Sequence, residues 1–490
     1  MKKISSIKKL ESWIDSYLNF EKTPKKNIFW LDTMKFFCEK FGHPENFAPC
    51  FHVAGSKGKG SVSVFIASIL DEAGYKTGLY TSPHILNFIE RVSSARGFFE
   101  EEIYNRAVEE IMKGVQEISV EELPENRPVT WFELVTLFSF LVFRQAKVDY
   151  SVFEVGLGGR LDSTNVINPI CSVITPIELE HTEFLGNTLE KIACEKAGII
   201  KENTPVIIAK QRPEVRKVFE KIAQEKNAKT IFFEDFIQDF EFKIQNMSIC
   251  IKNNTKKTND SKINKDICSK NQTSLQNLKN MPLMTVCFSS KIFPRPIKAD
   301  LQMIGKFQAE NAALAAIAVK NVLPTISSET IERGISKAKL PARFEIEQNP
   351  RGFENIPYLI LDGAHTVNSV RFTVETMNKV FGEKDFRNKT QRILLFACAA
   401  DKDSKDIAPL FANQFDSVFL TKPGNVKQSD LKTLAKSFDD AKIKYYLDED
   451  FEAQIKKAFA YANAEKSILL VTGSFYLISE VKKILIKDDF

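Results

Sequence analysis

The stretch Phe51-His-Val-Ala-Gly-Ser-Lys-Gly-Lys-Gly-Ser61 decides the fold class of this chain. Its first part, Phe51–Ala54, is a mostly apolar run that is typical of a buried strand, and Val62–Leu70 has the pattern of a helix. A glycine-rich turn joins the two segments. A strand that passes through such a turn into a helix is the repeating unit of an α/β fold with a parallel sheet.

The turn also has the composition of an anion site. Gly55, Gly58 and Gly60 permit a tight backbone that points its amides at an anion, and the start of a helix adds positive potential. Lys59 supplies a point charge for the terminal phosphates of a nucleotide. The strict phosphate-loop pattern is absent, because Gly60 follows Lys59 and no glycine stands five positions before Gly58. The turn therefore predicts phosphate binding, with a plain glycine turn carrying exposed lysines as the alternative.

Further apolar runs in the first half of the chain extend this unit into a sheet. Lys76–Thr81 is expected to be a second strand, and Tyr150–Val155 and Ile170–Thr175 are apolar runs suited to a buried parallel sheet. Thr285–Phe288 is expected to form a local antiparallel addition. The first half therefore predicts a phosphate-loop (P-loop) domain with a central, mostly parallel sheet.

The strand and helix alternation restarts after Lys339-Leu-Pro-Ala-Arg343, where Pro341 is a plausible hinge. The strands expected beyond it are Tyr358–Leu361, Arg392–Cys398, Ser417–Thr421, Lys444–Leu447 and Ser467–Thr472. We therefore predict an α/β protein with an N-terminal domain over residues 1–338, a hinge over 339–344, and a smaller, Rossmann-like α/β domain over 345–490.

The net charge of the chain comes from one segment. The 490 residues carry 68 basic and 63 acidic side chains, and 68 − 63 = +5. Residues 252–280 hold seven lysines and two aspartates, which is the whole excess, in an Asn- and Ser-rich run with no aromatic residue. This composition is typical of a disordered surface insert rather than of a nucleic-acid-binding face. No nucleic-acid partner is therefore expected.

Composition and patterning also address the compartment. With 43% hydrophobic and 27% charged residues, the chain has an ordinary globular composition. It has no apolar run near the roughly 20 residues of a membrane span, and Met1–Phe20 lacks the apolar stretch of a signal peptide. The eight cysteines include no C-x-x-C pair, so we expect reduced thiols. These features predict a cytoplasmic protein without a membrane partner, and we expect a monomer.

Seven motifs then match one family in order. They are Gly55-Ser-Lys-Gly-Lys-Gly-Ser61, Thr81-Ser-Pro-His84, Glu154-Val-Gly-Leu-Gly-Gly-Arg-Leu-Asp-Ser-Thr-Asn165, Glu180-His-Thr-Glu-Phe-Leu-Gly186, Glu195-Lys-Ala-Gly198, Asp362-Gly-Ala-His365 and Gly473-Ser474. Over about residues 32–485, apart from the insert at 252–280, the chain resembles the folylpolyglutamate synthase/dihydrofolate synthase family of the Mur ligase superfamily, whose members are ATP-dependent amide ligases. The resemblance implies an ATPase domain followed by a glutamate ligase domain.

The resemblance implies how the nucleotide is held. ATP is expected to bind Gly58, Lys59, Gly60, Ser61, Asn311, Arg343 and Asp362. An arginine at the hinge and an aspartate at a strand end would place it in a cleft, where domain closure excludes water from a hydrolysable intermediate. The implied catalytic residues are Lys59, His181 and Lys196.

The resemblance also implies two Mg²⁺ ions. Ser82, Glu154 and His181 are the expected ligands, and Lys196 joins them if CO₂ carbamylates it, because a carbamate is an anionic oxygen ligand. Each residue has an alternative interpretation. His181 would be a structural histidine, Glu154 would cap the Gly156–Gly159 loop, and Lys196 would pair with Glu195 or neutralise phosphate directly.

The helix that carries Lys196 has its own local signals. Thr188–Ala197 has a helical pattern, with Asn187 and Glu190 spaced as a capping box and Gly198 at its end.

For the substrates, the resemblance points to a pterin and L-glutamate. The implied pterin site is Thr130, Trp131, Phe132, Glu133, Leu161, Asp162 and Ser163, and His365 and Ser474 are implied for glutamate. Trp131 and Phe132 would stack on the heterocycle and Glu133 would bind its amino group. The alternative for Thr130–Glu133 is a buried helix start. The implied chemistry is phosphoryl transfer to the pterin carboxylate, followed by attack of the glutamate amine on the acyl phosphate.

Several residues depart from the usual family pattern. Ser56-Lys57 replaces Thr-Asn, Phe307 replaces a histidine, and Thr366 follows His365 where asparagine is usual. The segment Glu21–Leu31 lacks the Gly-Leu-x-Arg pattern, which leaves the choice between dihydropteroate and folate acceptors open. Two other functions compete with this one. They are another Mur-type amino-acid ligase acting on a cell-wall nucleotide, and a nucleotide-binding regulatory module that acts through residues 252–280.

Overall fold

The computed structural model describes residues 6–19, 30–244, 284–383 and 390–486. The chain divides into two compact units. The first comprises Met1–Phe240, Cys287–Ile297 and Phe307–Leu340, and the second comprises Glu241–Val286, Lys298–Lys306 and Pro341–Phe490. Both have α/β architecture, which confirms the predicted fold class. The predicted insert over residues 252–280 lies outside the described residues.

The first unit is built on a seven-stranded sheet with the order β3-β2-β4-β1-β5-β6-β7. Its strands are β1 Cys50–Ala54, β2 Thr77–Tyr80, β3 Val92–Ser93, β4 Tyr150–Glu154, β5 Cys171–Ile174, β6 Val206–Ile208 and β7 Thr230–Phe232. Only β3 pairs antiparallel, with β2. Because β1 is central and pairs Val53 with Glu154, the ends of β1 and β4 lie side by side.

Helices α1 to α13 belong to or border this unit. They are α1 Ser6–Ile14, α2 Asp32–Lys40, α3 Lys59–Glu72, α4 Glu101–Gln116, α5 Trp131–Ala146, α6 Thr182–Leu185, α7 Leu189–Ala197, α8 Pro213–Glu225, α9 Phe233–Phe236, α12 Lys306–Val322 and α13 Ser328–Lys337. Helix α13 packs directly against α3, because a Cβ on Gly334 would stand 2.5 Å from the Cα of Ile69. Within the described residues, none of the helices has the length and apolar content that crossing a membrane requires.

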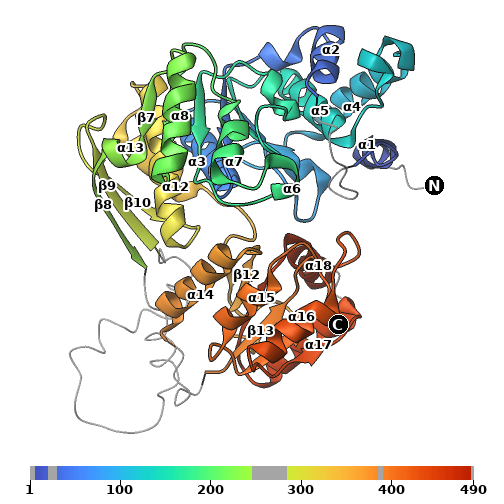
Figure 1. Cartoon of the computed structure of the whole chain (residues 1–490), viewed down its shortest axis with the longest axis vertical. Helices are drawn as coiled ribbons and strands as arrows, with labels where there is room; N and C mark the ends of the chain where they lie inside the picture. The colour runs from blue at the N-terminus through green and yellow to red at the C-terminus, as the bar shows by residue number, and fades with distance from the viewer. Residues whose placement is uncertain (1–5, 20–29, 245–283, 384–389, 487–490) are drawn as a thin grey trace. The chain divides into compact units, whose positions relative to one another are not determined.

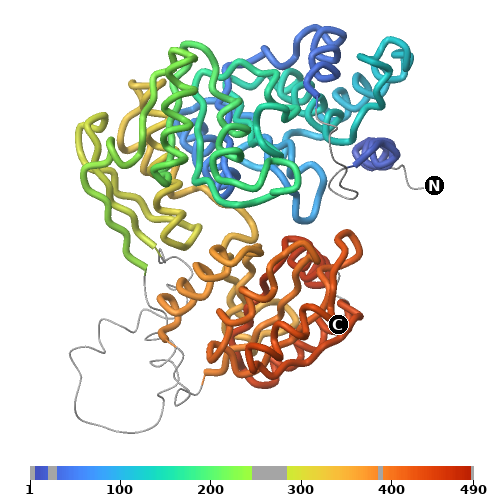
Figure 2. The backbone as a smooth tube through the Cα atoms, viewed as in Figure 1, coloured from blue at the N-terminus to red at the C-terminus, as the bar shows by residue number. Residues whose placement is uncertain are grey.

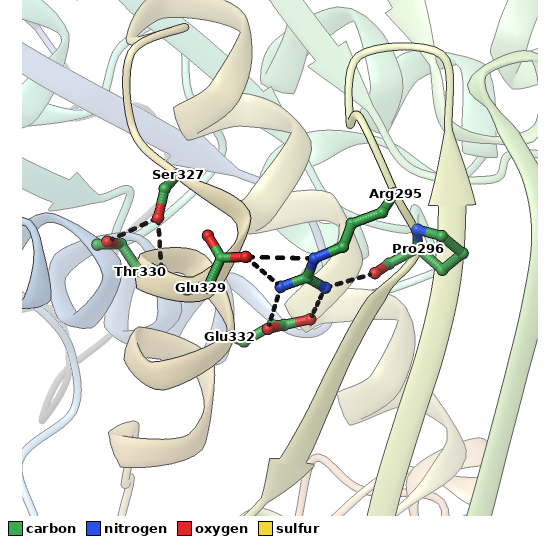
Figure 3. A network of polar contacts seen from close by, with 6 residues as sticks. All are labelled: Arg295, Pro296, Ser327, Glu329, Thr330 and Glu332. Atoms are coloured by element: carbon green, nitrogen blue, oxygen red, sulfur yellow. Dashed lines mark hydrogen bonds and ion pairs between the residues drawn. The ribbon is translucent and has the colours of Figure 1, made fainter.

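A separate three-stranded sheet has the order β10-β9-β8 (Figure 1), with β8 at Ile237–Ile244, β9 at Met284–Ser290 and β10 at Ile297–Leu301. The predicted strand over Thr285–Phe288 therefore exists, as part of β9. Arg295, between β9 and β10, donates to the carboxylates of Glu329 and Glu332 on α13 (Figure 3). Because Arg295 and Glu329 are exposed, solvent screens these ion pairs, and we expect the network to contribute little to stability.

The chain from Pro341 onward folds around a six-stranded sheet with the order β11-β12-β16-β13-β14-β15, traced in orange and red in Figure 2. The strands are β11 Glu345–Glu347, β12 Leu359–Asp362, β13 Arg392–Phe396, β14 Ser417–Leu420, β15 Tyr446–Leu447 and β16 Ile468–Thr472. All neighbours are parallel except β11 and β12. The helices are α14 Val367–Phe381, α15 Ser404–Ile407, α16 Leu431–Asp440, α17 Phe451–Ala464 and α18 Phe475–Ile486. All five predicted strands are present, and β11 is additional.

Candidate active site

The turn between β1 and α3 has the geometry of a phosphate loop. Gly55 has φ +142°, and a Cβ there would lie 1.9 Å from Oγ1 of Thr175. Gly58 caps the start of α3 with φ +90°, and its Cβ would lie 2.6 Å from Oδ1 of Asn311. Both positions therefore need glycine for two reasons, backbone conformation and space. The structure thus brings Asn311 of α12 next to this turn.

Hydrogen bonds fasten the loop to the segment that follows β5. The Ser56 amide donates to the carbonyl oxygen of Pro176 at 3.0 Å, and the Ser56 hydroxyl donates to that of Glu178 at 3.1 Å. Lys59 turns back and donates its Nζ to the carbonyl oxygen of Gly55 at 3.0 Å. The loop is therefore held in shape by the chain itself, with the start of α3 as its positive end.

Ser82 and Glu154, two of the predicted metal ligands, lie together. The amide of Ser82 donates to Oε2 of Glu154 at 2.9 Å, and Glu154 is 4% exposed. A Cβ on Gly60 would stand 3.3 Å from the same carboxylate oxygen, so Glu154 faces the first turn of α3. The third predicted ligand, His181, precedes α6 with a left-handed backbone at φ 47°. Within the described residues, no three His, Cys, Asp or Glu side chains gather as a metal site of their own.

Lys196 is 1% exposed and points at the phosphate loop. Its Nζ donates to the carbonyl oxygen of Gly55 and to Oε1 of Glu180, both at 2.8 Å. Burial lowers the pKa of Lys196, with Glu180 opposing the shift. Burial raises the pKa of Glu180, but the ammonium groups around it outweigh burial and lower that pKa overall. The alternative pairing with Glu195 is wrong, because Glu195 binds Arg160 instead, at 2.9 Å.

The start of α7 corrects one sequence prediction. The capping residue is Thr188, whose hydroxyl accepts from the amide of Lys191, and not Asn187. Gly198 ends the helix as predicted, but it has an ordinary right-handed backbone. The absence of a side chain there has a packing reason, because a Cβ on Gly198 would lie 2.4 Å from Arg160.

The predicted pterin segment Thr130–Glu133 forms the start of α5. Oε2 of Glu133 accepts from the amide and the hydroxyl of Thr130, at 2.8 and 2.7 Å, and the amide of Glu133 donates back to the hydroxyl. The Trp131 indole is buried and donates to Asp15 at 3.1 Å. This is the helix-start interpretation of the segment. Both bonds from Thr130 use Oε2 of Glu133, so a pterin that bound this oxygen would have to compete with them.

Phe132 is partly exposed, and it contacts the glycine loop that follows β4. A Cβ on Gly156 would stand 2.4 Å from the ring of Phe132. Asp162 holds this loop, because its carboxylate accepts from the amides of Leu157 and Thr164 at 2.8 and 3.0 Å. Leu161 and Ser163 flank Asp162 at the end of the loop. The structure therefore brings Phe132 and Leu161–Ser163 to opposite ends of one loop.

In the second unit, Asp362 and His365 lie at the end of β12. Asp362 is buried and accepts from the amides of Phe344 and Ala364 and from the hydroxyl of Thr373, at 2.7, 3.0 and 2.9 Å. Burial raises the pKa of Asp362. Nδ1 of His365 lies 2.8 Å from the carbonyl oxygen of Gly363, so it is the donor of that contact.

The ring of Phe475 connects two further predicted residues of this unit. The guanidinium of Arg343 lies over it at 4.4 Å, and His365 meets it edge-on at 5.8 Å. Ser474, directly before α18, accepts from the amide of Tyr476 at 3.1 Å. Arg343 and His365 therefore both contact the ring of Phe475, and Ser474 directly precedes Phe475 in the sequence.

Two carboxylates with clear roles carry no assignment in the sequence-based prediction. Glu180 is the partner of Lys196, and its position directly before His181 is the only signal for it. Glu90 accepts from the amides of Ile85, Leu86 and Asn87, at 2.7 to 2.9 Å, and so shapes the loop after Ser82. Such roles follow from where a side chain points, which a single sequence does not contain.

The chain matches known proteins over nearly its whole length. The model of the Mur ligase middle domain matches residues 53–319, and that of the Mur ligase glutamate ligase domain matches residues 342–475. These matches define a Mur ligase. The dihydrofolate synthase/folylpolyglutamate synthase of Bacillus subtilis is 31% identical over 488 residues, covering 96% of this chain and 97% of the relative.

Solved structures agree with these matches. The folylpolyglutamate synthase of Thermotoga maritima has a TM-score of 0.74 at 25% identity, covering 98% of this chain and 97% of that one. That of Mycobacterium tuberculosis, complexed with ADP, has a TM-score of 0.79 at 23% identity and covers 99% of both chains. The chain belongs to the dihydrofolate synthase/folylpolyglutamate synthase family, as its motifs predict, and it is an ATP-dependent ligase.

Proposed function

We propose that this ligase uses ATP to activate the carboxylate of a pterin substrate and then joins L-glutamate to it. The observation that carries the proposal is the buried contact of Lys196 with the phosphate loop, in a chain whose relatives bear this activity by name. The acceptor is dihydropteroate, a reduced folate, or both. The enzyme acts on small molecules, as a monomer in the cytoplasm.

The phosphate loop receives the nucleotide. The amides at the start of α3 and the ammonium of Lys59 bind the phosphates, with Gly58, Gly60 and Ser61 lining the turn and Asn311 beside Gly58. We propose Arg343 and Asp362 as further nucleotide contacts. In the M. tuberculosis neighbour the bound nucleotide is ADP, which is the product expected when the γ-phosphate is transferred.

The residues near the loop fit a hard cation. The Ser82 hydroxyl and the Glu154 carboxylate offer oxygen ligands, and Gly60 leaves the carboxylate open to the first turn of α3. We propose that they hold Mg²⁺ together with His181. A bound Mg²⁺ would neutralise charge on the transferred phosphoryl group.

Lys196 fits carbamylation by CO₂. Only a neutral amine reacts with CO₂, and burial lowers the pKa of Lys196 and so favours that form. The resulting carbamate would replace a cation with an anionic oxygen ligand for a second Mg²⁺. Glu180, which now pairs with the ammonium, would lose that partner and would have to turn toward the remaining lysines.

The reaction then takes two steps. A carboxylate oxygen of the pterin substrate attacks the γ-phosphorus of ATP, which gives an acyl phosphate and ADP. The amine of glutamate attacks the acyl carbon, phosphate leaves, and the amine loses a proton. Lys59 balances negative charge during the first step. We propose Phe132 and Leu161–Ser163, with the Thr130–Glu133 helix start, for the pterin, and His365 and Ser474 for glutamate.

A product assay tests this function. The purified protein is incubated with MgATP, L-glutamate and either dihydropteroate or tetrahydrofolate, and the products are separated by chromatography and weighed by mass spectrometry. We expect a pterin product heavier by one glutamyl residue, with ADP and phosphate formed in equal amounts. Failure with both acceptors, or ligation of an amino acid to a uridine-diphosphate sugar acceptor instead, would overturn the proposal.

A further inference from the structure

His52 is a fully buried histidine next to the phosphate loop, and the reaction above does not use it. It lies on β1, three residues before Gly55, with no solvent exposure. Its Nε2 lies 2.8 Å from the hydroxyl oxygen of Thr164, in the segment that follows the glycine loop. Its Nδ1 has no hydrogen-bond partner within the part of the chain that the structure describes.

The direction of the hydrogen bonds between His52, Thr164 and Asp162 determines the tautomer of the imidazole ring. The hydroxyl of Thr164 lies 2.5 Å from Oδ1 of Asp162, a carboxylate oxygen that can only accept, so the hydroxyl gives its one proton to Asp162. Thr164 must therefore accept from His52, which makes Nε2 the protonated nitrogen. The histidine is a neutral donor, with the proton on Nε2 and none on Nδ1.

Asp162 connects these hydrogen bonds to the glycine loop that follows β4. Its carboxylate accepts from the amide of Leu157 at 2.8 Å, and also from that of Gly156. The far end of the loop rests on α7, because the amide of Arg160 donates to the carbonyl oxygen of Glu195 at 2.7 Å. A Cβ on Gly159 would lie 3.0 Å from the Cα of Lys196, so the loop packs directly against the backbone of α7.

We propose that His52 is a positioning residue for the ligase reaction, which acts through Thr164 and Asp162 to hold the glycine loop against the helix that carries Lys196. The strand that leads into the phosphate loop is thereby coupled to the loop that follows Glu154. The expected effect of His52 on the reaction rate rests on the proposed function, whereas the direction of the hydrogen bonds from His52 to Thr164 and Asp162 does not.

The surroundings of His52 keep it neutral. Burial lowers the pKa of its imidazole to about 3, and the ammonium of Lys201 acts in the same direction. Cys50, two residues earlier on the same strand, is also buried, and burial raises the pKa of its thiol. No charge change at His52 is therefore expected over the working range of the enzyme.

The tautomer is tested on the unmodified protein by NMR. Long-range ¹H–¹⁵N spectra of protein labelled with ¹⁵N-histidine distinguish a protonated Nε2 from a protonated Nδ1. We expect one histidine that carries its proton on Nε2 and does not titrate between pH 5.5 and 8, and substitution of His52 should remove that signal. A titrating ring, or a proton on Nδ1, would overturn the inference.

The positioning role is tested with three variants of the full chain. His52→Gln places an amide nitrogen as many bonds from the backbone as Nε2, whereas His52→Leu places none there. We expect His52→Leu to lower kcat/KM for the pterin acceptor about 10- to 100-fold, and His52→Gln to stay within about threefold of the original. Cys50→Ala is the control for lost packing on the same face of β1, and it should keep full activity.

The outcomes separate this inference from the proposed function. Equal losses in His52→Gln and His52→Leu, or an equal loss in Cys50→Ala, would reduce His52 to a packing residue. If the protein ligates no pterin, hydrogen exchange still decides the matter. The amides of Leu157 and Thr164 should exchange about tenfold or more faster in His52→Leu than in His52→Gln, and equal rates would refute the coupling.

Discussion

Gly58 offers the sharpest test of the phosphate loop, because the chain contains a matched control. Gly58 has φ +90° and precedes α3, and Gly74 has φ +93° and follows the same helix. A Cβ on Gly58 would stand 2.6 Å from Oδ1 of Asn311, whereas a Cβ on Gly74 would meet nothing within 4 Å. The substitutions Gly58→Ala and Gly74→Ala therefore share the backbone strain and differ in the contact.

The expected magnitudes follow from this difference. A left-handed backbone costs an alanine about 1–2 kcal/mol, which is the whole expected loss of unfolding free energy in Gly74→Ala. Gly58→Ala adds an overlap with Asn311, whose amide is bonded to Gln308 at 3.2 Å and is 5% exposed, so it cannot swing aside. Such overpacking costs about 1–3 kcal/mol more. Displacement of Asn311 should also raise KM for ATP about tenfold or more.

Urea unfolding and steady-state kinetics on the two variants give the comparison. In a double-mutant cycle, the stability cost of Gly58→Ala should fall to that of Gly74→Ala once Asn311→Ala has removed the amide. The reasoning is refuted if Gly58→Ala and Gly74→Ala match in both stability and KM for ATP. It is also refuted if Asn311→Ala leaves the cost of Gly58→Ala unchanged.

Three further variants test separate parts of the site. Lys196→Met should lower the rate of ligation more than about 100-fold. The control is Glu195→Gln, which breaks only the exposed ion pair with Arg160. It should leave the rate unchanged and change the free energy of unfolding by less than about 1 kcal/mol. Thr130→Ala should lower the free energy of unfolding by about 1 kcal/mol through loss of the α5 cap, with Thr130→Ser as the control that retains it; urea titrations that find no difference would contradict the assignment. The pKa of His52 is about 3 in the folded protein, against an ordinary 6.5, so between these pH values only the unfolded chain binds the proton and the free energy of unfolding rises with pH. On going from pH 7.5 to 5.5, the wild type should therefore lose about 1.4 kcal/mol more of its free energy of unfolding than His52→Gln does. Equal losses would be incompatible with a buried neutral ring.

Local patterns predicted most of the fold. The glycine turn, the apolar runs of the parallel sheet and the strand series after Pro341 are signals carried by consecutive residues, and each corresponds to an element of the structure. Six strands were not predicted individually. Strands β3, β6, β7 and β11 are two or three residues long, and so short a run carries little periodicity. Strands β8 and β10 are longer, but their polar and apolar residues alternate along exposed faces, so they lack the continuous apolar run that marks the buried parallel strands.

The pairing of side chains was the harder part to predict. Lys196 has Glu195 beside it in the sequence, but a helix points neighbouring residues in different directions, and its partner is Glu180 from the loop before α6. Asn187 and Thr188 are both good capping residues, and only the backbone conformation chooses between them. For Glu133 the sequence left two uses open, and the structure shows its carboxylate occupied by the helix start.

The electrostatics of the phosphate loop explain why Glu180 lies where it does. Lys59 and Lys196 both donate to the carbonyl oxygen of Gly55, so their two ammonium groups lie close together. Lys57 is near enough to add to the positive potential at Lys196. A buried ammonium without a counter-charge is strongly disfavoured, and Glu180 supplies that charge to Lys196. Phosphates that enter the loop bring negative charge of their own and compete for both lysines. Because negative phosphates stabilise the ammonium form of Lys196, the carbamylation proposed above, which needs the neutral amine, is favoured before ATP enters the loop and disfavoured once the phosphates lie beside the amine.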